Sequence, residues 1–164
     1  SERGYAWRTA ELYLNRAEAY AAKFAASDAT SGEKAVNDIN TIRKNRIATA
    51  SYTDYQLGTA DELMKKVRAE RRVELCFENP HRWFDLRRYR VCKVQPEKIS
   101  ITHHFSVYQS DTSSDAPLET RTYVLPEDDP SWTMPIPQEV INFNTGMPNN
   151  GNVTRRPVST SAKE

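Results

Sequence analysis

The chain has 164 residues, with 23 Lys+Arg against 22 Asp+Glu and a formal net charge of +1. This balance gives no indication of nucleic-acid binding or of attraction to an anionic membrane surface. No apolar run approaches the roughly 20 residues of a membrane-spanning helix, whereas a chain of this length can bury a substantial core.

Apolar residues recur at helical spacing in the first part of the chain. The stretch from Tyr5 to Ala26 is predicted to be a helix with one apolar face. The members of that face are Ala6, Trp7, Ala10, Tyr13, Leu14, Ala17, Ala21 and Phe24. So many alanines on one face predict a close contact with another helix.

Two further helix starts carry the pattern of a capping box, a side-chain oxygen followed three residues later by a glutamate. Thr30 and Glu33 fit this pattern before a second helix, and Thr59 and Glu62 fit it before a third. Pro80 is expected to end the third helix, because the residue before a proline is pushed out of the helical region. A short helix is expected from His81 to Tyr89.

The run from Arg68 to Arg88, RAERRVELCFENPHRWFDLRR, interleaves arginines, glutamates and aromatics. With about 100° per residue, Val67 and Phe77 fall within roughly 40° of Leu63 on a helical wheel. Glu70 and Glu74 lie between them. Carboxylates in an apolar stripe must be paired, because an isolated buried charge is very unfavourable.

The second predicted helix contains an arginine that could pair with these carboxylates. Arg43 lies within an apolar face made by Val36, Ile39 and Ile47. We predict a structural ion-pair network in which Arg43 pairs with Glu70 or Glu74. Arg82 and Arg87 are the competing partners. Such pairing is expected to depress the pKa values of both carboxyls.

Beyond residue 92 the pattern changes to that of strands. Apolar and polar residues alternate from Ile99 to Val107, and Thr120 to Leu125 is a second extended segment. The polar stretch SDTSSDAP between them is predicted to join a hairpin. From Pro126 onward proline, asparagine, glycine and serine predict a tail with little regular structure.

The sequence gives little support for a catalytic or metal-binding site. His81, His103 and His104 are the only histidines, and none has a nucleophile turn beside it. Glu78 and His81 have the spacing of a carboxylate-bridged metal site, but Pro80 interrupts the helix that it requires. No metal or cofactor is expected. Cys76 and Cys92 could form a disulfide, although packing as reduced residues is favoured.

Several separated segments together resemble the SusD/RagB family of bacterial outer-membrane nutrient-binding lipoproteins. These segments are WRTAELYLNRAEAYAAKF, EKAVNDINTIRKNRI, ERRVELCFENPHRWFDLRR and MPIPQEVINFN. They follow, in the same order, the C-terminal region of that family. The RWFDLRR and Pro-Ile-Pro segments at this separation make the resemblance specific.

The resemblance implies a mainly α fold of tetratricopeptide-like helical pairs, followed by a small β-hairpin and a long irregular C-terminal tail. Residues 1–164 would form a single C-terminal domain of a longer protein, with a helical part at 1–92 and the hairpin and tail at 93–164. It further implies a surface-exposed lipoprotein of the outer membrane whose signal and lipid anchor precede this segment. Its expected partners are a SusC-like TonB-dependent transporter and an oligosaccharide or other nutrient, and not nucleic acid.

The expected function is therefore non-catalytic binding of a nutrient, most simply a glycan. A helical-repeat adaptor for protein partners is the alternative, and a glycoside hydrolase using Glu70 and Glu74 is a weaker one. Tyr108, Tyr123 and Trp132 are candidate ligand-binding residues, because aromatics in or beside irregular segments can stack on sugar rings. The alternative for each is that it anchors its loop.

Overall fold

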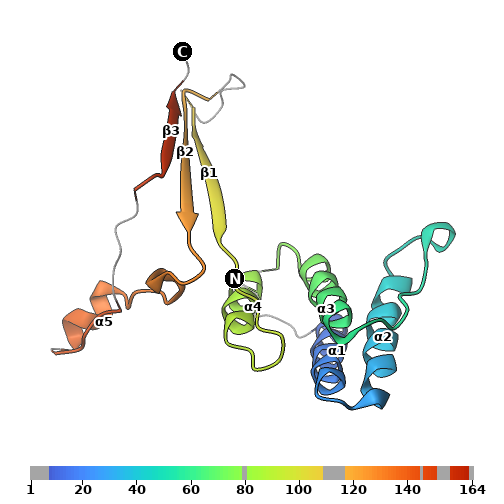
Figure 1. The fold of residues 1–164 in the computed structure, drawn as a ribbon. Coiled ribbons are helices and arrows are strands. Elements are labelled where there is room, and N and C mark those ends of the chain that lie inside the picture. The colour runs from blue at the N-terminus through green and yellow to red at the C-terminus, as the bar shows by residue number, and fades with distance from the viewer. Residues whose placement is uncertain (1–7, 79–80, 109–116, 145, 151–155, 163–164) are drawn as a thin grey trace. The chain divides into compact units, whose positions relative to one another are not determined.

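The computed structural model describes residues 8–78, 81–108, 117–144, 146–150 and 156–162 (Figure 1). It divides into two compact units, Ser1–Glu97 and Lys98–Glu164. The first unit is helical, and the second holds a small sheet and two short helices. The mainly α fold class with a small antiparallel sheet is confirmed. The expected single domain stays a prediction.

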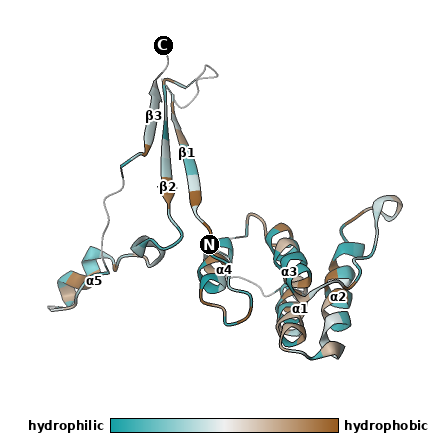
Figure 2. Ribbon diagram, in the orientation of Figure 1, coloured by the Kyte–Doolittle hydropathy of each residue, from teal (hydrophilic) through white to brown (hydrophobic). Residues whose placement is uncertain are grey.

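Three helices form the body of the first unit. They are α1 (Thr9–Ala25), α2 (Ala29–Lys44) and α3 (Ala60–Glu74). α1 packs against both α2 and α3, and Figure 2 shows apolar and polar residues alternating along these helices. Ala17, Ala21 and Ala35 have no exposed surface, which confirms the close helix contact predicted from the alanines. Ile39 and Val67 are also fully buried, and each such side chain contributes about 1.5 to 3 kcal/mol.

The two predicted capping boxes have different outcomes. At α3 the box is confirmed, since Glu62 N donates to Thr59 Oγ1 at 3.3 Å and Thr59 N donates to Glu62 Oε2 at 2.8 Å. At α2 the prediction from Thr30 is wrong. The helix begins at Ala29 and is capped by Asp28, which accepts hydrogen bonds from Thr30 N and from Ser31 Oγ. Asp28 precedes Thr30 in the chain and offers two acceptor oxygens to the same turn.

The ends of α2 and α3 come earlier than the sequence predicted. α2 ends at Lys44, so Ile47 does not share its face. α3 ends at Glu74, and Phe77 then takes a left-handed conformation with φ of 62° and is fully exposed. The wheel position predicted for Phe77 is therefore wrong, because the wheel has no meaning beyond the last helical residue. Asn79 and Pro80 lie outside the described residues.

The predicted short helix after Pro80 is confirmed as α4 (His81–Arg90). A single 3-10 turn, η1 (Thr49–Ser51), lies in the connection between α2 and α3. Cys76 and Cys92 are both free, so the possible disulfide is not formed.

The second unit contains the predicted hairpin. β1 (Ile101–Val107) pairs antiparallel with β2 (Glu119–Leu125), from Ile101 opposite Leu125 to Val107 opposite Glu119. Most of the loop between them lies outside the described residues. The alternation in β1 does not produce a buried face, since Phe105 is 50% exposed and both His103 and His104 are exposed.

The tail holds regular elements that the sequence did not predict. They are η2 (Pro130–Trp132), the short helix α5 (Gln138–Phe143) and β3 (Ser159–Ala162). β3 pairs antiparallel with β2, so the sheet order is β1-β2-β3 and β2 is the central strand. The polar sequence of β3 has no apolar alternation, and only its pairing with β2 defines it.

Candidate functional site

Arg43 connects α2 to α3 and to the loop between them. Its Nη1 lies 3.7 Å from Glu70 Oε2, and both side chains are only 13% exposed. Its guanidinium also lies 3.5 Å from the centre of the Tyr55 ring and donates to the Thr53 carbonyl at 3.2 Å. Of the two carboxylates predicted for Arg43, the structure thus places Glu70 beside it.

Glu74 has other partners, which the sequence did not identify. Arg46, just beyond α2, donates to both of its carboxylate oxygens, at 3.0 and 2.8 Å. Arg8 Nη2 lies 3.3 Å from the same carboxylate and also donates to the Glu74 carbonyl. Arg8 and Arg46 therefore join the last turn of α3 to the segments that flank α1 and α2.

The predicted direction of the Glu70 pKa is wrong. Burial raises the pKa of this carboxyl, and the nearby charge of Glu74 raises it further. Arg43 opposes both effects without overcoming them. A 3.7 Å contact leaves much of the desolvation cost uncompensated.

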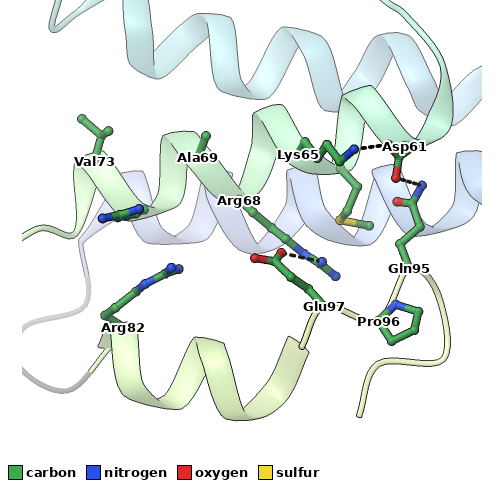
Figure 3. Close-up of a pocket in the computed structure, with 11 residues that line it drawn as sticks. Asp61, Lys65, Arg68, Ala69, Val73, Arg82, Gln95, Pro96 and Glu97 are labelled. Carbon is green, nitrogen blue, oxygen red and sulfur yellow. Dashed lines mark hydrogen bonds and ion pairs between the residues drawn. The ribbon is translucent and has the colours of Figure 1, made fainter. Parts of the chain in front are cut away.

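Arg82 and Arg87 do not act as the predicted competitors. Within the described part of the chain, the ion pairs of Glu70 and Glu74 are made with Arg43, Arg46 and Arg8. Arg82 instead lines a groove beside α3, where Figure 3 shows it reaching from α4 toward α3.

Among the described residues of the first unit, the most buried ion pair lies elsewhere. Arg71 and Asp85 are each 6% exposed, and Arg71 Nε donates to Asp85 Oδ2 at 2.7 Å. Arg71 also donates to Asn15 Oδ1 at 2.8 Å and approaches Glu11 at 3.8 Å. These contacts join α3, α4 and α1. On the same wheel Arg71 falls about 40° from Val67, a signal that would have marked it as a buried arginine.

Arg88 extends this network on α4. It donates to Asp85 Oδ1 at 3.1 Å and to Glu18 of α1 at 2.9 Å, and the bond to Glu18 raises the pKa of Arg88. Beside it, Tyr89 is 1% exposed, and burial raises the pKa of its hydroxyl. Asp85, Arg88 and Tyr89 therefore serve to fix α4 against α1 and α3.

The candidate ligand-binding aromatics lie in the second unit. Tyr108 follows β1 and is 47% exposed, and Tyr123 lies half-buried in β2 opposite His103. Trp132 is 5% exposed, and its indole N–H donates to the Pro126 carbonyl at 2.7 Å. Its burial and this hydrogen bond agree with the alternative that Trp132 anchors its loop.

The described residues contain no group of three or more His, Cys, Asp and Glu side chains that could hold a metal ion. No helix among them has the length and apolar character needed to cross a membrane. Glu74 and Asp85 are among the carboxylates of the first unit that pair with arginines, an arrangement suited to holding helices together.

The helices of the first unit and the small sheet of the second define a mainly α fold with a small antiparallel sheet. The chain belongs to the SusD family, whose pattern it matches over residues 1–152. It is also similar to the crystal structure of a SusD-like protein from Bacteroides fragilis, with 26% identity and a TM-score of 0.51. That similarity covers 86% of this chain but 24% of the other, so this chain spans about a quarter of that protein's length. None of the curated proteins matches the chain.

Proposed function

We propose that this chain is the C-terminal region of a non-catalytic, cell-surface nutrient-binding protein that works with a TonB-dependent, SusC-like outer-membrane transporter. The proposal rests on one observation, the match to the SusD family over residues 1–152. A glycan is the proposed nutrient. The proposed location is the outer surface of the outer membrane, through a lipid anchor on a part of the protein that precedes this sequence.

The ion pairs of the first unit support a binding scaffold over a hydrolase. Glu70 and Glu74 lie on adjacent turns of α3, but each faces at least one arginine. A general acid must lie within hydrogen-bond reach of its substrate, and a carboxyl that is covered by arginines is poorly placed for that. The weaker hydrolase alternative would therefore require Glu74, whose side chain is 6% exposed, to act from beneath Arg46 and Arg8.

Tyr108 and Tyr123 are the residues of this chain that we propose for stacking on a sugar ring. Tyr108 is open to solvent and Tyr123 is half-buried on the central strand of the sheet. We prefer these two residues to Trp132, because its burial and its hydrogen bond to the Pro126 carbonyl support the alternative that it anchors its loop.

The test uses the full-length protein in two assays. Binding to a panel of oligosaccharides is measured by calorimetry, and the native transporter complex is sought by copurification from outer membranes. We expect both a glycan ligand and the transporter. A protein that binds no glycan and copurifies with a soluble partner would favour the adaptor. Glycan hydrolysis abolished by Glu74→Gln would establish the hydrolase.

The contribution of the aromatics is tested in the same calorimetric assay. Tyr108→Ala should weaken the binding of a glycan that stacks on this ring by about 2- to 13-fold, since a lost aromatic contact is worth roughly 0.5 to 1.5 kcal/mol. Phe105→Ala, a change of similar size at a half-exposed residue of β1, the strand that Tyr108 follows, is the matched control. Equal weakening by both variants would remove Tyr108 from the proposed site.

A further inference from the structure

A groove with an excess of positive charge lies beside α3 in the first unit. Its volume is about 670 Å³, within the range of small-molecule sites. Its walls come from α3, from Arg82 on α4 and from the segment Gln95–Glu97. The charged residues that line it are Lys65, Arg68, Arg72 and Arg82 against Asp61 and Glu97.

Both acids of the groove already have a cation. Asp61 Oδ2 lies 2.5 Å from Lys65 Nζ, and Glu97 Oε2 lies 3.1 Å from Arg68 Nη1 (Figure 3). Among the ion pairs of the described residues, none includes Arg72 or Arg82. Two guanidinium groups without a carboxylate therefore line one groove, and a partly enclosed wall strengthens their field.

Arg68 forms a rigid part of the groove. It is 7% exposed, and its guanidinium stacks 4.2 Å from the centre of the Tyr89 ring. Only Nη1 has a hydrogen-bond partner, since Nε and Nη2 are buried without one among the described residues. Glu97 therefore occupies the side of Arg68 where an anion would bind.

The chemistry of the lining selects a particular ligand group. Guanidinium groups present paired donors that match the oxygens of a carboxylate or sulfate. Ala69, Val73 and Pro96 line the same groove and supply apolar surface beside the charges. A molecule that combines an acidic group with a ring or chain of carbon atoms fits both features.

We propose that this groove binds the carboxylate or sulfate of an acidic glycan, with Arg72 and Arg82 as direct contacts. Arg68 adds its charge, and Glu97 competes with the ligand for it. The glycan part rests on the proposed function, whereas the anionic part rests on the groove alone.

The test measures binding to the protein by calorimetry at low ionic strength, with trigalacturonate as the probe. Its fully methyl-esterified form has the same size without the charge, and inorganic sulfate represents the free anion. We expect trigalacturonate to bind at least tenfold more tightly than either. Arg72→Gln/Arg82→Gln should weaken it at least tenfold, while Lys23→Gln/Lys44→Gln, with the same change in net charge outside the groove, should not.

The Glu97→Gln variant should change the affinity for trigalacturonate in the opposite direction. Removing the competing carboxylate should strengthen binding of trigalacturonate severalfold, a result that damage to the fold would not produce. Far-ultraviolet circular dichroism checks that each variant is folded, and Arg82→Gln alone replaces the double variant if that one does not fold.

Three results would overturn the proposal: equal binding of the acid and its ester, binding of sulfate alone, or equal weakening by the two double variants. These results are distinguishable from failure of the proposed function. If the full-length protein binds neutral glycans and its transporter but not trigalacturonate, the proposed function stands and the proposed anion site in the groove is refuted. If it binds trigalacturonate but no transporter, the anion site stands and the proposed function is refuted.

Discussion

Asp85→Ala removes the closest partner of a buried arginine. The Asp85 carboxylate accepts from Arg71 at 2.7 Å, and both residues are 6% exposed. Alanine would leave the Arg71 guanidinium with Asn15 at 2.8 Å and with Glu11 at 3.8 Å. One neutral hydrogen bond and one distant carboxylate compensate poorly for the lost ion pair.

The expected loss of stability follows from these contacts. Breaking a buried ion pair by removing one partner costs about 3 to 5 kcal/mol. The contacts that Arg71 keeps favour the lower end, about 3 kcal/mol. Arg88, the other partner of Asp85, has a side chain that is 45% exposed and adds little. With an m value of about 2 kcal/mol/M, the midpoint of urea unfolding should fall by about 1.5 M.

Equilibrium unfolding followed by helical circular dichroism measures this shift. Lys65→Ala is the control, since it breaks an exposed ion pair in the same unit and should leave the midpoint of urea unfolding nearly unchanged. Arg71→Met/Asp85→Leu should recover more than half of the loss, because apolar residues of similar volume need no charge partner. An Asp85→Ala protein within about 1 kcal/mol of the parent would refute this reasoning.

Three further predictions concern the same unit. Burial raises the pKa of Glu70, so the stability that it contributes is fully present below its ordinary value of 4.5 and is lost as pH rises through the folded value. Urea unfolding should therefore show the parent losing stability relative to Glu70→Gln between pH 4 and 7, and a gain instead would mean that Arg43 outweighs burial. Tyr89→Phe should change thermal stability by less than about 0.5 kcal/mol or raise it, because among the described residues the buried hydroxyl has no hydrogen-bond partner; a loss above about 1 kcal/mol would reveal one. Thr59→Ala should cost about 1 kcal/mol by removing a cap of α3, whereas Thr41→Ala, at an exposed position within α2, should cost less.

Local signals in the sequence predicted most of the first unit. The alanine face of α1 and the capping box at Thr59 depend only on spacing within one helix, and both are observed. The end of α3 was missed because Phe77 adopts a positive φ without the glycine that would normally mark it. β3 was missed because its pairing with β2 joins segments far apart in the chain.

The partners of the charged residues were harder to predict than the helices. Helical spacing placed Glu70 and Glu74 in the apolar stripe, and both lie against arginines. The choice between Arg43 and Arg46 depends on where α2 ends, which the sequence did not define. The direction of the Glu70 pKa depends on the balance of burial and a 3.7 Å contact, a balance that only the three-dimensional structure contains.

The order of the sheet has a consequence for synthesis on the ribosome. β2 lies between β1 and β3, but β3 comes 33 residues after β2 ends, counting residues 126 to 158. The ribosome adds about 5 to 20 residues per second, so several seconds pass before β3 is complete. During this time the hairpin can form while one edge of β2 stays uncovered. The nascent hairpin thus presents an open backbone edge to other chains until Ser159–Ala162 emerges.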